Sequence, residues 1–438
     1  MKNSIKKNYN TFSQFFRKKR RLLFNTLFSA LLLTAPSGVF AQVSLSEQST
    51  LDFQGYIRTG IGFSEGGENQ EMFGAPGAAS KYRLGNEADT SIELAFDYRQ
   101  YLDGIGNEDG AYVQGYFMLD AYTVHGTEDS LGLSNVAQGY LNFANFFSSD
   151  ISFWVGRRYY ERQSTYMTDH FWLNTAQNGQ GGAGIEGVHA LNGELKVAVL
   201  RNEDDLGNDV VQSSNIDVRV LDIPVNLGGK LNLFSLYSKR HKQESLSLDD
   251  ENGYAVGLWH QQSLFSGHAI NTLRLIHRDG AAVPQGDFAP NPLINDATIT
   301  NPTITEVGTD LVYEPNGDFA IGVTAVYQKR EVTVSGSKID SDWYSIGVRP
   351  NYFINDHLAW VLDLGYDRVK GDTNDGDLLK GTIALQLGKA RGYWSRPVLR
   401  TFVTYALWDD DFQGAVGGDT YANDTNGWTA GIQGEWWW

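Results

Sequence analysis

Apolar and polar residues alternate with a period of two along much of the chain. In the stretch 358–366, every even position is Leu, Trp or Tyr, whereas the odd positions hold Ala, Val, Asp and Gly. Successive side chains of a β-strand point to opposite faces, but a helix repeats about every 3.6 residues. Similar alternation predicts further strands at 51–61, 91–98, 151–160, 195–201, 216–222, 230–238, 268–276, 319–328, 343–352, 379–387 and 399–407. The pattern indicates an all-β protein.

The alternation does not by itself say which face is buried, because a soluble β-sandwich buries its apolar face and a membrane barrel turns that face to lipid. Charged residues recur on the polar face, with Gly between them, which suits a wet lumen; they are Asp52, Arg58, Glu93, Asp97, Arg349, Asp363 and Arg400. Aromatic residues lie at predicted strand ends, as in the girdles at membrane interfaces; they are Tyr98, Trp154, Tyr159, Tyr352, Trp360, Tyr366 and Tyr405. We therefore favour a transmembrane antiparallel β-barrel, with a secreted β-sandwich as the alternative.

The chain length bounds the size of this barrel. A membrane strand of about ten residues with its share of connections takes roughly 20–25 residues, so residues 42–438 give about 16–18 strands. A barrel of that size encloses an aqueous channel. The chain shows no Pro/Ser-rich linker and no second apolar run of the roughly 20 residues that a membrane helix needs. It ends on aromatic Trp438, as outer-membrane barrels commonly do. These features predict a single barrel domain over 42–438.

The first 41 residues have the features of an export signal. Basic residues dominate up to Arg21, an apolar stretch follows over 22–35, and Val39 and Ala41 suit a signal peptidase. An uncleaved basic tail is the alternative. Removing the eight Lys and Arg residues of this leader leaves 27 basic and 52 acidic side chains, a net charge of −25. Such a chain lacks the basic surface that nucleic-acid binding needs, and it has no cysteine for a disulfide.

Four segments, in order along the chain, carry a resemblance to one protein family. They are 51–60 (LDFQGYIRTG), 80–87 (SKYRLGNE), 156–162 (GRRYYER) continuing to 167–169 (MTD), and 394–397 (WSRP) continuing to Trp408. Together they resemble the maltoporin family of sugar-specific outer-membrane porins. The resemblance implies a homotrimer of 18-stranded barrels in outer-membrane lipid, each with a loop folded into the channel. It also implies an aromatic rail beside polar tracks that bind oligosaccharides.

The resemblance assigns individual residues to these features. Tyr56 and Trp437 correspond to sugar-stacking positions of the rail, and the period of two places Tyr56 inward with Arg58 and Trp437 inward with Glu435. The polar tracks and the constriction correspond to Arg58, Arg83, Glu93, Arg162, Asp169 and Phe171. Arginine donates and carboxylates accept paired hydrogen bonds, which matches the hydroxyl rim of a sugar. The alternative for each charged residue is a group that only hydrates the lumen or pairs with a neighbour.

The sequence also departs from the family pattern. Ser91, His268 and Leu387 stand at or near rail positions where the family has aromatic residues, and Phe171 replaces the constriction tyrosine. Tyr112, Tyr116 and Tyr122 share one face of their strand and offer a different set of lumen aromatics. These differences weaken the inference that this chain shares the maltodextrin preference of the family.

The function predicted from these features is facilitated diffusion of oligosaccharides across the bacterial outer membrane. Maltodextrin-type α-glucans are the substrates expected first. A general or other-sugar porin on the same fold is the alternative. No constellation of nucleophile, base and metal-spaced histidines indicates an enzyme, and no cofactor is expected. His170, beside Asp169, is interpreted as loop packing. Whether a metal ion binds is left open.

Overall fold

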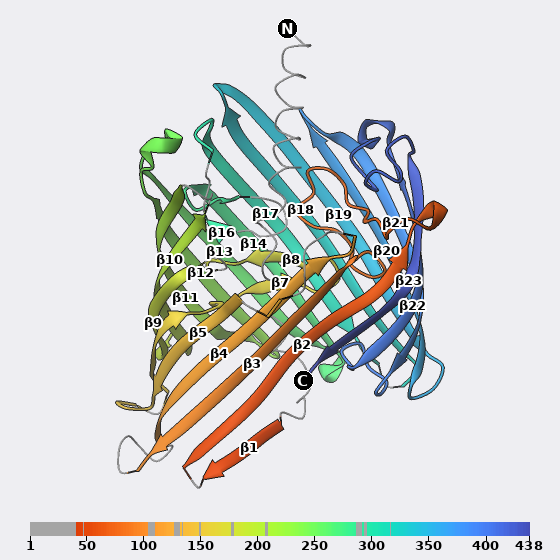
Figure 1. Ribbon diagram of the computed structural model, residues 1–438. Helices are drawn as coiled ribbons and strands as arrows, with labels where there is room; N and C mark the ends of the chain where they lie inside the picture. The colour runs from red at the N-terminus through yellow and green to blue at the C-terminus, as the bar shows by residue number, and fades with distance from the viewer. Residues whose placement is uncertain are drawn as a thin grey trace.

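The computed structural model describes residues 41–46, 48–103, 110–126, 132–133, 135–148, 150–176, 179–205, 209–285, 291–292, 296–315 and 317–438. Within these ranges, 18 antiparallel strands form a closed barrel (Figure 1). The strands are β2 (Ser49–Phe63), β3 (Asp89–Leu102), β4 (Ala111–Val124), β5 (Asn135–Ala144), β6 (Ser152–Arg157), β9 (Gly179–Ala190), β10 (Gly193–Asp205), β11 (Val210–Asn226), β12 (Gly229–Arg240), β13 (Glu251–Leu264), β14 (Ala269–Gly280), β17 (Ile299–Tyr313), β18 (Phe319–Val334), β19 (Ser337–Phe353), β20 (Leu358–Gly371), β21 (Asp375–Gly388), β22 (Val398–Trp408) and β23 (Asn426–Trp437). The expected barrel of about 18 strands is confirmed.

The barrel closes where its first strand pairs with its last. In this pairing of β2 with β23, Tyr56 lies opposite Trp437 and Arg58 lies opposite Glu435. A short strand, β1 (Ala41–Ser46), pairs with the start of β2 and lies outside the closed ring (Figure 1). Most of the predicted export signal falls in residues 1–40, which lie outside the described residues.

Small elements lie in the connections between barrel strands. Two short ribbons are formed by β7 (Gln163–Thr165) with β8 (His170–Leu173), and by β15 (Pro284–Gln285) with β16 (Asn291–Pro292). The 3-10 turns are η2 (Glu65–Gly67), η3 (Glu244–Leu246), η4 (Phe265–Gly267) and η5 (Asp410–Phe412). Across the described ranges, no helix has the length and apolarity to cross a membrane.

The two faces of the strands have the predicted orientation. On β20, Leu364 points outward with 41% of its surface exposed, whereas the adjacent Asp363 is fully inaccessible inside the barrel. The charged residues expected to face inward, from Asp52 to Arg400, are all buried. Hydrocarbon chains cannot solvate a carboxylate or a guanidinium, so the apolar side of each strand faces lipid and the charged side faces the lumen.

Five of the seven aromatic residues predicted at membrane interfaces are exposed on the barrel: Tyr98, Tyr352, Trp360, Tyr366 and Tyr405. The prediction was wrong for Trp154 and Tyr159, which are 2% and 6% exposed. The strand there ends at Arg157, and its outward face consists of Phe153 and Val155. Trp154 therefore points inward, and Tyr159 belongs to the chain that follows the strand into the lumen.

Long connections at one end of the barrel fold into its interior. Residues 64–88, between β2 and β3, form what we call the first inward segment, and residues 158–176, between β6 and β9, form the second. The resemblance implied one such loop, and the structure has two. Aromatic side chains pack each segment on the inner wall: Phe73 lies 5.7 Å from Trp408 and Trp172 lies 5.6 Å from Trp259, between ring centroids.

Candidate functional site in the lumen

The first inward segment is held against the inner wall of the four strands β19–β22. The Tyr82 ring occupies a space that exists because Gly347 and Gly365 lack side chains, since an added Cβ would lie 2.1 and 2.0 Å from the ring. The Tyr82 and Ser345 hydroxyls form a 2.9 Å hydrogen bond. Lys380 Nζ donates a 2.8 Å hydrogen bond to the carbonyl oxygen of Leu84. These contacts fix the position of the neighbouring Arg83 in the lumen.

The second inward segment is fixed by polar contacts with other strands of the wall, among them β11 and β17. His170 Nε2 lies 2.8 Å from Glu306 Oε2 on β17, and the Thr165 hydroxyl donates to Asp310 at 2.9 Å. Further along, the Thr175 hydroxyl donates to Asp217 on β11 at 2.8 Å. The interpretation of His170 as a packing residue therefore agrees with its burial and its carboxylate partner.

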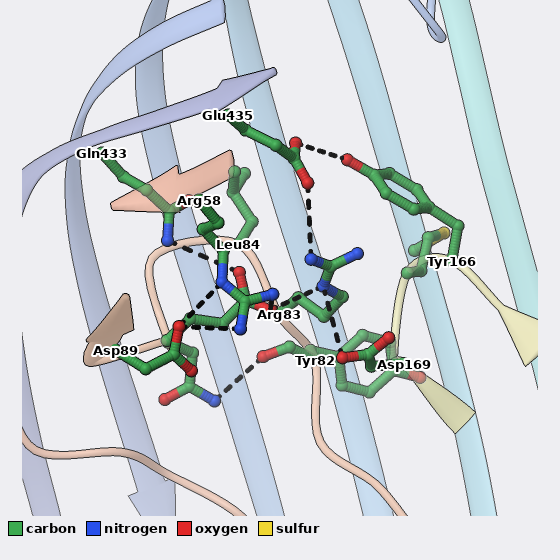
Figure 2. Close-up of polar contacts among 12 residues, drawn as sticks. Arg58, Tyr82, Arg83, Leu84, Asp89, Tyr166, Asp169, Gln433 and Glu435 are labelled. Atoms are coloured by element: carbon green, nitrogen blue, oxygen red, sulfur yellow. Dashed lines mark hydrogen bonds and ion pairs between the residues drawn. The ribbon is translucent and has the colours of Figure 1, made fainter. Parts of the chain in front are cut away.

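A network of buried charges connects the inward segments to the strands (Figure 2). Arg58 on β2 lies 2.7 Å from Asp89 and 2.8 Å from Glu87. Arg83 lies 2.6 Å from the same Glu87 and 3.9 Å from Asp169 of the second segment. Because buried charges require compensation, each of these groups holds the others in place.

Glu435 on β23 is the carboxylate at the centre of this network. It lies 2.9 Å from Arg396, 3.0 Å from Arg400 and 3.4 Å from Arg83. The Tyr166 hydroxyl donates a 2.9 Å hydrogen bond to Oε2, the oxygen that Arg396 and Arg400 also contact, and Figure 2 shows Tyr166 and Arg83 converging on Glu435. One carboxylate thus joins the last strand, both inward segments and the connection before β22.

The charges change the acidity of groups on the inward segments. Burial opposes ionisation of Glu87, but the guanidinium groups of Arg58 and Arg83 outweigh it and hold the pKa of Glu87 below its usual value. Burial raises the pKa of Asp169, and the nearby Arg83 only partly offsets this effect. The two carboxylates therefore differ in the pH at which they lose their charge.

The two residues predicted to stack on sugar lie in this network. Tyr56 is only 3% exposed, and its hydroxyl donates to Glu435 at 3.2 Å and accepts from Arg58 at 3.3 Å. Trp437 is half-buried, and the Arg396 guanidinium lies 4.1 Å from its ring centre. In this conformation, the Tyr56 hydroxyl serves the polar network, and Trp437 presents part of its surface to the lumen.

The remaining predicted residues lie in the second inward segment and on β3. Arg162 stacks on Tyr159, with 3.3 Å between the guanidinium carbon and the ring centre, and lies 5.8 Å from the Phe171 ring centre. Glu93 projects from the adjacent wall on β3 and is buried. The structure thus places Arg58, Arg83 and Asp169 in one cluster and Arg162 beside Phe171, whereas Glu93 lies on β3 opposite Tyr56 of β2. Their roles in sugar contact stay predictions.

The model of the LamB porin family matches residues 51–438. The chain belongs to the LamB porin family. This is the maltoporin family, so the resemblance drawn from the sequence is confirmed. As a LamB porin with a closed 18-strand barrel, the protein resides in the bacterial outer membrane. It acts as a porin and not as an enzyme.

Several solved porin structures are similar to this LamB porin in outline. One is OpdK of Pseudomonas aeruginosa, solved with vanillate, which is 10% identical with a TM-score of 0.44. The match covers 89% of this chain and 99% of OpdK. It covers 98% of the outer-membrane channel DcaP of Acinetobacter baumannii, at 11% identity and a TM-score of 0.42 over 89% of this chain. An anion-selective porin from Comamonas acidovorans is matched over its full length and 89% of this chain, at 10% identity and a TM-score of 0.42.

The lumen of this LamB porin contains an aromatic cluster that sequence reasoning missed. Tyr166, from the second inward segment, lies 5.0 Å from Trp394 and 6.3 Å from Trp437, between ring centroids. Trp394 also lies 5.0 Å from Tyr393, and both precede β22. Tyr166, Trp394 and Trp437 are each half-buried. Trp394 was noted only within a matching segment, because the alternation pattern covers strands and gives no direction for side chains in connections.

A short hydrolase-like sequence pattern at residues 62–66 has a structural role in this protein. Residues 62–66 read Gly-Phe-Ser-Glu-Gly and fit the Gly-x-Ser-x-Gly pattern of hydrolases, which the sequence reasoning overlooked. Ser64 is fully buried, and its hydroxyl accepts a 2.9 Å hydrogen bond from the Glu71 backbone N–H. The strand-to-helix turn of the pattern is replaced here by the start of the first inward segment. In the described part of the LamB porin, no three acidic or histidine side chains are placed to hold a metal ion.

Proposed function

We propose that this LamB porin carries oligosaccharides across the outer membrane by facilitated diffusion, with maltodextrin-type α-glucans as the first candidates. The observation that carries the proposal is the half-buried aromatic cluster beside the Glu435 network. Trp437 and Trp394 offer apolar surface, while Arg396 and Glu435 lie within reach of the same region. A sugar ring has an apolar C–H face, which can lie on the tryptophan rings, and a polar rim of hydroxyls, which can hydrogen-bond the charged pair.

The mixture of contacts suits transport better than retention. Hydrogen-bond donors and acceptors at the site already satisfy one another, so a sugar hydroxyl exchanges one partner for another with a small net gain. A channel requires binding that is weak and repeated, so that the solute moves on. A satisfied polar network with partly accessible aromatic residues meets that requirement.

Sugar-dependent block of ion current through single channels tests this proposal. The purified protein is inserted into planar bilayers, and current is recorded with glucose, maltose, maltotriose and maltohexaose, with sucrose and a cello-oligosaccharide for comparison. We expect saturable current block that strengthens with glucan length. Current that decreases only in proportion to solution viscosity, without saturation for any sugar, contradicts the proposal.

A general porin is the second candidate, and one observation favours it. The Tyr56 ring is buried, Ser91 offers no stacking surface at its rail position, and Leu387, expected near a rail position, instead lies on the outer face of β21 with 53% of its surface exposed. A channel of this kind shows no saturable block in the same recordings. Equal block by the glucan and cello-oligosaccharide series indicates instead a porin for other sugars.

We propose further that the protein works as a homotrimer and that residues 1–41 are removed on export to leave a barrel domain over 42–438. The family resemblance supports the trimer, and the basic and apolar leader supports the cleavage. Native mass spectrometry of the detergent-extracted protein checks both points. We expect three copies per complex and a mature chain that begins at Gln42.

A further inference from the structure

Three neighbouring turns at the end of the barrel opposite the inward segments each carry a large, exposed apolar residue. Residues 191–192 join β9 to β10, residues 227–228 join β11 to β12, and residues 265–268 join β13 to β14. None of these turns contains Asp, Glu, Lys or Arg. Outer-membrane barrels have their short turns on the periplasmic side, so these turns belong to the periplasmic rim. We call their exposed residues the apolar tips: Leu191, Leu227 and Phe265, which are 64%, 99% and 65% exposed.

The backbone of two of these turns does not favour the residues found there. Leu191 and Phe265 have φ angles of 53° and 51°, in the left-handed region. That region suits Gly, Asn or Asp, and it is strained for a bulky side chain. Two-residue hairpin turns ordinarily place Asn-Gly or Asp-Gly there. Because polar residues would suit both the backbone and water better, an apolar environment is needed to explain Leu191 and Phe265.

Phe265 extends the lipid-facing wall of the barrel beyond the strand ends. Its ring lies 5.3 Å from the ring of Tyr313, between centroids. The period of two places Tyr313 on the outer face of β17 with Val307, which is exposed on that face. The adjoining strand β14 carries exposed Leu273 and Leu275. The apolar surface that lipid covers therefore runs along these strands to the turn.

The turns on the other side of the same rim are charged. Asp318 lies between β17 and β18, and Asp356 lies between β19 and β20. Arg391, in the connection before β22, forms ion pairs with both aspartates, at 3.0 Å in the case of Asp356. Charged groups are costly to transfer into hydrocarbon, so this half of the rim belongs in water. The rim thus has an apolar half and a charged half.

We propose that the apolar tips insert into the periplasmic leaflet of the outer membrane, where phospholipid acyl chains cover them, while the charged half of the rim stays in water. The tips lie on separate turns two strands apart, which is roughly 10 Å at the spacing of paired strands. A fluid layer covers such separate points, whereas a protein partner requires a surface of matching shape. The barrel then sits deeper in the lipid on its β9–β14 side. This inference is independent of the solute that the channel carries.

Depth-dependent fluorescence quenching tests the inference. The chain has no cysteine, so a single introduced thiol places one bimane fluorophore at a chosen site. Leu191→Cys, Leu227→Cys and Phe265→Cys are labelled and reconstituted in vesicles of phosphatidylethanolamine and phosphatidylglycerol. Asp356→Cys, at an exposed turn of the charged half, is the matched control. A nitroxide on the lipid acyl chain quenches fluorophores inside the membrane, and iodide on both sides of the vesicle quenches those in water.

We expect nitroxide quenching to be several-fold stronger at the three tips than at the control, and iodide quenching to show the reverse order. Tips that iodide quenches as strongly as the control lie in water, which overturns the inference. Tips protected from both quenchers are covered by protein, either a second copy or another partner, and this result also overturns it. Equal nitroxide quenching at the tips and the control contradicts the division of the rim. Each tip gives its own reading, so if one variant fails to insert, the other two decide.

Discussion

The backbone N–H of Arg83 donates a 3.0 Å hydrogen bond to the carbonyl oxygen of Met167, and this bond joins the two inward segments inside the barrel. Each segment is also anchored to its own part of the wall. The constriction is therefore a fixed structure formed by two connections that support each other, and changes to either anchor should alter conduction.

Replacing Lys380 tests the anchor of the first inward segment. Lys380→Met removes the hydrogen bond to Leu84 and leaves Asp363 without one of its two cationic partners. Breaking one side of a buried charge pair costs about 3–5 kcal/mol. We expect a lower unfolding temperature and noisier single-channel current, measured by thermal unfolding in detergent and by bilayer recording. Lys329→Met removes a half-exposed lysine that, within the described residues, pairs only with Glu331 at 3.0 Å; it is the control and should change neither.

The space under Tyr82 gives a steric prediction. Gly365→Ala places a methyl group about 2.0 Å from the Tyr82 ring, so the ring must leave its position against the wall. We expect the first inward segment to shift and the conductance to change. Gly434→Ala is the matched control, because the nearest atoms to its added Cβ lie 3.9 Å away. Equal conductance of the two variants contradicts the placement of Tyr82.

Removing the central carboxylate should change ion selectivity. Glu435→Gln leaves Arg83, Arg396 and Arg400 with one negative partner fewer, so the lumen becomes more positive. We expect the reversal potential in a salt gradient to shift toward anion selectivity. The same substitution should lower stability by about 3–5 kcal/mol, since buried arginines lose compensation. An unchanged reversal potential places Glu435 away from the ion path.

The raised pKa of Asp169 predicts a pH response. Its carboxylate is charged above that pKa and loses the charge as the pH falls through it, earlier than an ordinary aspartate does. We expect the channel to become more anion-selective as acidification passes this point, at a higher pH than an ordinary aspartate would give. Reversal potentials between pH 7 and pH 3.5 measure this, and Asp169→Asn should remove the step. A step that persists in Asp169→Asn assigns it to another group.

The aromatic cluster gives a prediction for sugar affinity. Trp394→Ala removes half-buried lumen surface next to Tyr166, whereas Trp436→Ala removes an indole on the outer, lipid-facing side. An aromatic contact is worth about 1 kcal/mol beyond its buried area, so we expect block by maltohexaose to weaken several-fold in the first variant only. Equal effects of both substitutions contradict a lumen role for Trp394.

Much of the barrel follows from the alternation of residues, and the exceptions have physical reasons. The strand β9 contains Gly at five of its twelve positions, so few side chains mark its two faces. On β13, inward Trp259 and outward Leu258 are both apolar, which removes the contrast between the faces. Long strands with charges on one side, such as β20, were predictable because lipid and lumen impose opposite chemistry on successive residues.

The site was less predictable than the wall that supports it. Arg58 and Glu435 share an inward face by strand geometry, but Tyr166 meets Arg396 across 230 positions of sequence. Such a contact depends on how far a connection enters the barrel, which no local pattern encodes.

The pairing of β2 with β23 has a consequence for biogenesis. The wall has two open edges until residues 426–437 are in place, and those edges expose unpaired backbone groups that lipid cannot satisfy. Glu435 and Trp437 arrive with that final strand. Closure of the barrel in the membrane and completion of the transport path therefore occur together. A chain that lacks this strand can neither close its wall nor form the path.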